Sequence, residues 1–191
     1  MFLPFQAVAN FFKEPSGPKC PECYSVLIDG ACPNLDCPVK VSEWITRWCS
    51  PGAAKIPALG QAKAGQLAKL RLVLHPGELY ELAQGDWDQL EGVSAEQLAD
   101  IQGQMEGSKS AEPSAVLYGL KLPGVDERLA KHLIEVFSSI DGLRVSKPER
   151  LQQIEGIDEE QCVEICRWFR DSVNKKALTM LEQNGFNLGE Q

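Results

Sequence analysis

Four of the seven cysteines have the spacing of a metal site. They follow the pattern Cys-x2-Cys-x8-Cys-x4-Cys and are Cys20, Cys23, Cys32 and Cys37. Two short-spaced pairs separated by a small loop suit a tetrahedral zinc site, to which each pair supplies two thiolates. Four protein thiolates leave no position for water or substrate, so we expect a structural Zn²⁺. Because so short a segment buries little apolar surface, the metal would supply much of its folding free energy.

The other cysteines and both histidines are expected to be structural or surface residues. Cys49 stands alone at the end of an expected short helix, and we expect it to pack. Cys162 and Cys166 lie one helical turn apart; packing is the preferred interpretation, with a cross-link or a second metal as the alternative. His75 and His132 lie neither near a cysteine pair nor in a nucleophile motif. An independent enzyme acting through these residues therefore lacks an activating constellation.

A five-residue pattern occurs four times at offsets of 34, 32 and 32 residues. It reads aliphatic-x-Gly/Ala-aliphatic-Gly/Ser/Asp and covers residues 56–60, 90–94, 122–126 and 154–158. A small or apolar residue follows four positions later and an aliphatic residue three positions after that. These spacings keep the later apolar residues on one face of a helix. The sequence therefore predicts four helix-hairpin-helix units, whose later apolar residues are Ala64, Leu67, Leu98, Ile101, Ala130, Leu133, Cys162 and Ile165.

The turns also carry residues that start helices. Glycine permits positive φ and close approach of the backbone. Ser94, Asp126 and Asp158 are good N-caps for the second helix of their units. Upstream of the fourth turn, Ser146-Lys147-Pro148-Glu149 fits a capping box.

The predicted fold is mainly α: a small four-cysteine zinc finger at 17–41, then an all-α domain of four helix-hairpin-helix repeats at 42–191. With 191 residues, 43% of them hydrophobic, the chain is long enough for one to two compact domains. Residues 1–16 form an apolar extension that we expect to dock on its own domain or on a partner. No run approaches ~18 apolar residues, and no signal-peptide pattern is present. We therefore expect a cytoplasmic protein without membrane contact.

The net charge of −8 disfavours binding to nucleic acid through a broad basic surface. Hairpin turns offer another route, because backbone N–H groups at a helix N-terminus hold a phosphate without a long basic side chain. As the alternative, the repeats only pack together and bind partners elsewhere. The candidate DNA-binding residues are Lys55, Leu59, Gly60, Gln61, Lys63, Gly92, Val93, Ser94, Gly124, Val125, Gly156 and Ile157.

The order of these elements resembles the C-terminal half of bacterial NAD-dependent DNA ligase. The resemblance covers about residues 17–188 and rests on the cysteine spacing, the run from Trp48 to Gly60 and the register of the four hairpins. It implies that the four cysteines hold zinc. It also implies that the hairpins bind the minor-groove side of double-stranded DNA around a nick. The expected role is in DNA replication or repair, in association with the nucleoid.

Two departures from that family matter. Its adenylated lysine lies in a Lys-x-Asp-Gly motif, but the nearest tetrads here are Leu27-Ile28-Asp29-Gly30 and Ser139-Ile140-Asp141-Gly142. The remaining residues leave no room for the NAD-recognition, OB-fold or BRCT domains, so we expect no NAD site and no ligase activity from this chain alone. The family's turns usually carry two glycines, whereas the third and fourth turns here have Asp126 and Asp158. Each carboxylate would repel a docking phosphate by ~1 kcal/mol in water at ~4 Å.

Three functions stay open at this point. The preferred one is a non-catalytic, sequence-independent DNA-binding module. The second is one part of a split DNA ligase that needs a separate catalytic chain. The third is a degenerate paralogue that serves as a protein-interaction module, for example with another repair protein.

Overall fold

The computed structural model describes residues 17–189, so the extension expected at 1–16 lies outside the described residues. Within this range the fold is helical and contains no strand; two isolated β-bridges, Lys19 with Val26 and Ile28 with Ala31, tie the finger loops together. This confirms the predicted fold class. The helices are α2 (Pro38–Trp48), α3 (Gly60–Lys69), η2 (Pro76–Glu81), α4 (Gln84–Trp87), α5 (Ala95–Ser108), α6 (Pro113–Gly119), α7 (Glu127–Phe137), α8 (Ile140–Arg144), α9 (Pro148–Leu151), α10 (Glu159–Arg170) and α11 (Ser172–Gln183).

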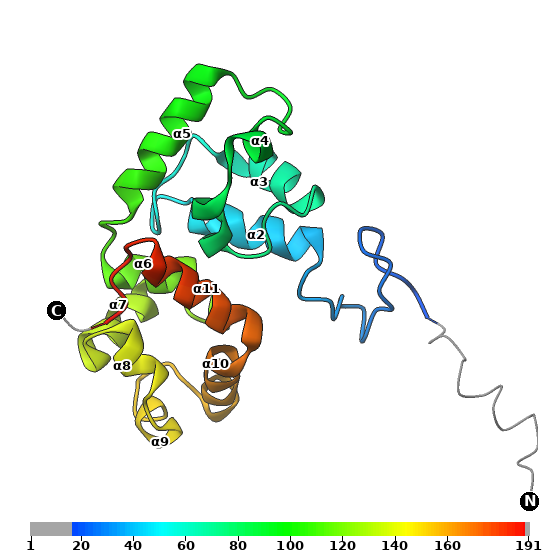
Figure 1. The fold of residues 1–191 in the computed structure, drawn as a ribbon. Helices are drawn as coiled ribbons and strands as arrows, with labels where there is room; N and C mark the ends of the chain where they lie inside the picture. The colour runs from blue at the N-terminus through cyan, green and yellow to red at the C-terminus, as the bar shows by residue number, and fades with distance from the viewer. Residues whose placement is uncertain (1–16, 190–191) are drawn as a thin grey trace, which may run out of the picture.

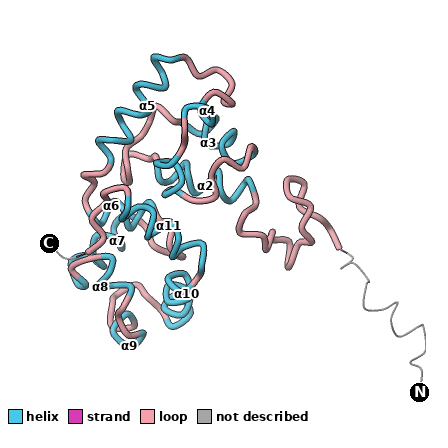
Figure 2. The backbone as a smooth tube through the Cα atoms, in the orientation of Figure 1, coloured by secondary structure: helices cyan, strands magenta, loops and turns pink. Residues whose placement is uncertain are grey.

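The helix α2 is the centre of the fold. Its buried residues Val41, Ile45 and Trp48 are spaced by four and three, so they form one apolar face. The helix contacts α3, η2 and α6, and Figure 1 shows it between the group α3–α5 and the group α6–α11. The finger loops continue directly into its N-terminal end (Figure 2). The metal segment and the hairpins therefore share one rigid element.

The four repeats fold as their pattern predicts. Each turn connects two helices, and the helices that follow the turns are α3, α5, α7 and α10. The apolar positions four and seven residues beyond each turn are buried in all four repeats, including Cys162, whose side chain is fully covered. The equivalent core residues from the four repeats belong to one continuous cluster. Hairpin packing thus supplies the hydrophobic core.

The helix starts confirm three caps and correct a fourth. Ser94, Asp126 and Asp158 each accept a hydrogen bond from the backbone N–H three residues later. The predicted capping box at Ser146 is wrong: the N-cap of α9 is Lys147, and the buried Ser146 hydroxyl has no hydrogen-bond partner among the described residues. Pro148 explains the difference, because its fixed φ starts a helix at the first position without a side-chain cap.

Cys49 was expected to pack inside the protein. Cys49 is the C-cap of α2 and is buried, as predicted. Burial raises the pKa of its thiol to about 12, which makes it a poor nucleophile at neutral pH.

Among residues 17–189, no helix has the length and apolar character needed to cross a bilayer.

Candidate metal centre and nucleic-acid interface

The four predicted cysteines meet in space and form a candidate metal centre. Their sulfur atoms all lie within 4.8 Å of one another. The Sγ atoms of Cys20 and Cys37 are 3.8 Å apart, and those of Cys23 and Cys32 are 3.4 Å apart. A tetrahedral ion with Zn–S bonds of ~2.3 Å would require sulfur separations of ~3.8 Å. The arrangement therefore fits an ion of that size without a change of fold.

The surroundings of the cluster act on its thiols in opposite directions. Cys37 is the N-cap of α2 and is 1% exposed; burial raises the pKa of its thiol, and the backbone N–H groups of Val39 and Lys40 oppose that rise. The side chain and backbone of Ser25 lower the pKa of Cys23 to about 6, whereas loss of hydration and the Cys23 partner raise the pKa of Cys32 to about 12. Cys23 therefore loses its proton more readily than Cys32, and a bound cation would favour the thiolate form of both.

The four turns do not share one backbone conformation. In the second, third and fourth turns the third residue is a glycine with positive φ: Gly92 (70°), Gly124 (66°) and Gly156 (90°). In the first turn the residue with positive φ is Gly60 (61°), at the fifth position, while Ala58 at the third position has no positive φ. The first hairpin is therefore a distinct variant whose flexible residue lies at the helix start.

The structure narrows which turn amides can meet a ligand. The N–H groups of Leu59, Val125 and Ile157 donate within their own turns, and their side chains are buried. Val93 is half-buried. By contrast, the exposed amides of the three glycines at the third position have no acceptor among the described residues. Gly92, Gly124 and Gly156 are therefore three backbone donors that remain available to a ligand.

Acidic N-caps occupy other donors at two turns. The Asp126 carboxylate accepts from the Leu129 N–H at 2.7 Å, and the Asp158 carboxylate accepts from the Gln161 N–H at 2.8 Å. At the second turn, the neutral Ser94 hydroxyl accepts the equivalent bond from the Gln97 N–H. The Gln97 Oε1 accepts a bond from the Ser94 N–H in return. The second hairpin thus keeps a helix start without a carboxylate N-cap.

Glutamine side chains join the hairpins in pairs. The Ala58 N–H donates to Gln104 of α5, and Gln66 of α3 bonds both the N–H and the carbonyl of Glu91, which ties the first two hairpins together. Gln161 of α10 donates to the Pro123 carbonyl of the third turn. Sequence reasoning missed these residues, because nothing local to a glutamine indicates its distant partner.

The first and fourth hairpins differ in local charge. Between residues 44 and 77 the chain has no Asp or Glu and five basic residues: Arg47, Lys55, Lys63, Lys69 and Arg71. Between residues 152 and 166 it has no Lys or Arg and five acidic residues: Glu155, Asp158, Glu159, Glu160 and Glu164. The first hairpin is therefore basic and the fourth is acidic.

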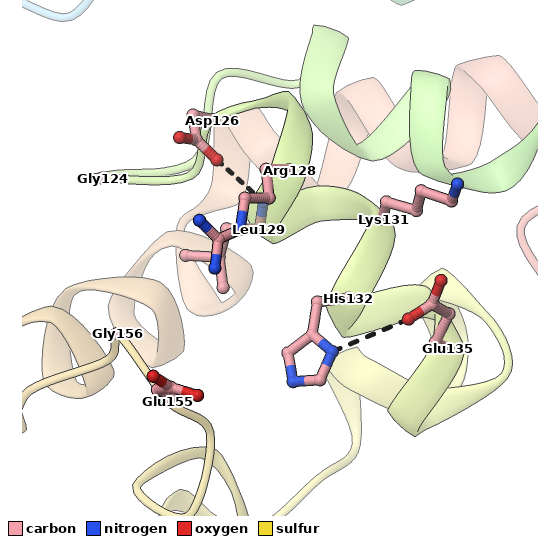
Figure 3. A pocket seen from close by; sticks show the side chains of 9 residues that line it. All are labelled: Gly124, Asp126, Arg128, Leu129, Lys131, His132, Glu135, Glu155 and Gly156. Atoms are coloured by element: carbon pink, nitrogen blue, oxygen red, sulfur yellow. Dashed lines mark hydrogen bonds and ion pairs between the residues drawn. The ribbon is translucent and has the colours of Figure 1, made fainter.

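A cleft of about 550 Å³ separates the third and fourth hairpins (Figure 3). Its rim carries the glycines of both turns. Its lining includes two basic residues, Arg128 and Lys131, and three acidic ones, Asp126, Glu135 and Glu155. His132 lies 3.7 Å from Glu135 and is half-exposed. With more acidic than basic groups, this cleft is a poor site for an anion.

Comparison with known proteins agrees with this architecture. Residues 115–178 match the helix-hairpin-helix motif family. The chain is 30% identical to DNA ligase of Koribacter versatilis over 91% of its own length, and 30% identical to DNA ligase of Prochlorococcus marinus over 89%. It is 33% identical to DNA ligase of Rubrobacter xylanophilus over 83%. The chain spans about a quarter of the length of these relatives. Over nearly its whole length, the chain therefore resembles the zinc-finger and helix-hairpin-helix region of bacterial DNA ligase.

Proposed function

We propose that the chain is a sequence-independent DNA-binding module that acts in replication or repair and performs no chemistry by itself. The observation that carries this proposal is the similarity to DNA ligases along about 90% of the chain. The hairpin geometry supports it, since exposed turn amides hold phosphates without reading sequence. Nucleoid association would follow from DNA binding.

Zn²⁺ is the proposed ion of the four-cysteine centre, with Cys20, Cys23, Cys32 and Cys37 as its ligands. Its role would be structural, holding residues 17–37 in register with α2. We retain the division into a finger at 17–41 and a hairpin domain at 42–191, although α2 crosses that boundary.

The proposed DNA contact is strongest at the first two hairpins. There Lys55, Gly60, Gln61 and Lys63 lie on a segment without acidic residues. The second hairpin adds the exposed Gly92 amide and the neutral Ser94 cap. The third and fourth turns would contribute the amides of Gly124 and Gly156. The carboxylates of their N-caps, Asp126 and Asp158, would repel the phosphate there. A preference for nicked duplex is part of the proposal.

A second candidate function is favoured by the acidic fourth hairpin. Five carboxylates without a basic neighbour in residues 152–166 suit a basic protein surface better than DNA. In this second candidate function, that surface belongs to a ligase catalytic chain. Addition of this chain to an isolated ligase catalytic part would then raise nick sealing.

Fluorescence anisotropy with a nicked and an intact duplex tests the main proposal. We expect binding that weakens steeply from ~50 to ~200 mM salt, as phosphate contacts require. Lys55→Glu with Lys63→Glu should weaken binding, whereas Lys147→Glu, at an exposed site outside the basic segment, should change it little. No binding to either duplex at ~20–50 mM salt would overturn DNA binding as the function.

A further inference from the structure

A pocket of about 310 Å³ with several polar side chains in its lining lies between α2, the start of α3 and α6. Thr46 and Arg47 of α2, Ser50 after its end, Gln61 at the start of α3 and Tyr118 of α6 line it. The pocket thus lies where the first hairpin approaches the helix that precedes the third turn. Thr46, Arg47, Ser50 and Gln61 all belong to the segment of residues 44–77, which has no Asp or Glu.

Hydrogen bonds hold the guanidinium of Arg47 in this pocket, and no carboxylate of the described residues pairs with it. Its Nε donates to the Tyr118 carbonyl at 3.0 Å, its Nη2 donates to the Val125 carbonyl, and its carbon lies 4.2 Å from the centre of the Tyr118 ring. Among residues 17–189, no carboxylate lies within 4 Å of it. Two of its five N–H groups are used, so an oriented cation remains with donors to spare.

Two hydroxyl groups in the same pocket also lack partners. The side-chain oxygens of Thr46 and Ser50 are buried in their present rotamers and make no hydrogen bond to the described part of the chain. A bond between either hydroxyl and a ligand in the pocket would require rotation about Cα–Cβ, which breaks no hydrogen bond to the described residues. Because an unsatisfied buried hydroxyl costs free energy, a ligand with several acceptor oxygens would relieve both.

The one carboxylate at the rim does not cancel this charge. Glu43 lines the pocket but pairs with Lys121, whose Nζ lies 2.8 Å from Oε2, and is mostly exposed. This pair is neutral as a unit, so the pocket keeps the single positive charge of Arg47. An anion with many acceptors and no donors suits this set of groups, whereas a cation or an apolar ligand does not.

We propose that this pocket binds one backbone phosphate of double-stranded DNA through Arg47, Thr46, Ser50 and Gln61. The assignment rests on the proposed DNA-binding function and adds to it a side-chain site that is separate from the turn amides. A duplex lying on the first hairpin would carry phosphates past Gln61 at the helix start. Arg47 then couples this phosphate to the third turn through its bond to Val125.

The hydroxyl variants test the pocket with little risk to folding. Thr46→Val and Ser50→Ala remove groups that make no hydrogen bond within residues 17–189, so thermal stability should be kept. If the hydroxyls bind a phosphate, the double variant should bind duplex about tenfold more weakly at constant salt. Ser146→Ala is the matched control, because its hydroxyl is also buried and unpartnered but lies before α9.

The salt dependence tests the charge. Arg47→Gln should lower the slope of log affinity against log salt by about 0.9, the value for one phosphate contact, and Arg47→Lys should restore it. A residue that only positions the third turn would lower affinity in both variants and leave the slope unchanged.

Three results would overturn the assignment. If the wild-type chain does not bind duplex, both the proposed function and this site fail. If the wild type binds and the hydroxyl and Arg47→Gln variants match it in affinity and slope, only the pocket fails. If inorganic phosphate shifts the Arg47 Nε resonance in an NMR titration and duplex does not, the pocket takes a free anion instead of DNA.

Discussion

The Asp126 carboxylate accepts a hydrogen bond from the Leu129 N–H at 2.7 Å, so a negative charge caps the helix that follows the third turn. Asp158 does the same for the fourth turn. A carboxylate ~4 Å from a phosphate oxygen costs ~1 kcal/mol in water, which is about fivefold in affinity for each site. Asp126→Ser with Asp158→Ser keeps both caps and removes both charges. We expect the double variant to bind nicked duplex more tightly, by an amount that shrinks as salt rises.

The control for this prediction is another acidic cap. Asp171 accepts from the Val173 and Asn174 N–H groups at the start of α11, away from the four turns. Asp171→Ser should leave DNA affinity nearly unchanged. Equal affinity of the Asp126/Asp158 double variant and the wild type, at low salt and equal stability, would mean that these carboxylates do not face a phosphate.

The metal centre should be needed for the finger and much less for the helices. Residues 17–37 bury few apolar side chains, and Tyr24 is 73% exposed. The helical core, by contrast, is continuous and lies beyond Cys37. We expect one Zn²⁺ per chain by elemental analysis, and chelation should expose the finger to protease while most ellipticity at 222 nm remains. Cys32→Ser should lose the metal, whereas Cys166→Ser should retain it. Cooperative loss of all helix on chelation would contradict this division.

A buried hydrogen-bond chain should stabilise the contact between the first two hairpins. Trp48 Nε1 donates to the Tyr80 hydroxyl at 3.1 Å, Tyr80 bonds Ser108 at 2.7 Å, and Ser108 donates to the Met105 carbonyl at 2.6 Å. These residues come from α2, η2 and α5. Tyr80→Phe leaves the Trp48 N–H without an acceptor, and we expect it to lower the free energy of unfolding by about 1–3 kcal/mol in urea titrations.

The exposed Tyr24 supplies the comparison for the Tyr80 variant. Tyr24→Phe should change stability by less than ~0.5 kcal/mol, as is usual for surface substitutions. If Tyr80→Phe is equally neutral, the buried chain does not contribute to stability as we expect.

The hairpins and the clustering of the four cysteines were predictable because their signals are local. A buried residue such as Leu67 or Ile165 is marked by its spacing from a turn, and Cys20 and Cys37 by their spacing from other cysteines. The same locality explains the three confirmed caps. Ser146 failed because Pro148 moved the helix start by one residue, and a capping box read from sequence assumes a fixed start.

The parts that sequence could not predict depend on contacts between distant residues. Arg47 reaches Val125, 78 positions away, and Gln161 reaches Pro123, 38 positions away. Nothing in their neighbours indicates these bonds. The basic first hairpin was readable from the sequence, because residues 44–77 contain no Asp or Glu, but the net charge of the whole chain does not reveal it.

Burial of His75 is expected to make the stability of this fold depend on pH. Its ring is 1% exposed, and neither nitrogen has a hydrogen-bond partner among the described residues. Burial lowers the pKa of His75 below its usual 6.5; the Glu78 carboxylate 3.5 Å away opposes this, and the Lys176 ammonium reinforces it. The unfolded chain therefore binds a proton at His75 that the folded chain excludes. Stability is full above pH ~6.5 and falls as the pH drops below it.

Urea unfolding at pH 7.5 and 5.5 measures this effect. Both values lie above the range in which Glu78 titrates, because the Lys176 ammonium and the Leu74 N–H hold the pKa of that carboxyl below its usual value against the opposing effect of burial. We expect the wild type to lose stability between the two pH values and His75→Leu to lose less. His132→Gln, at a half-exposed site, should keep the wild-type loss. A His75→Leu variant with the same loss as the wild type would show that another group titrates in this range.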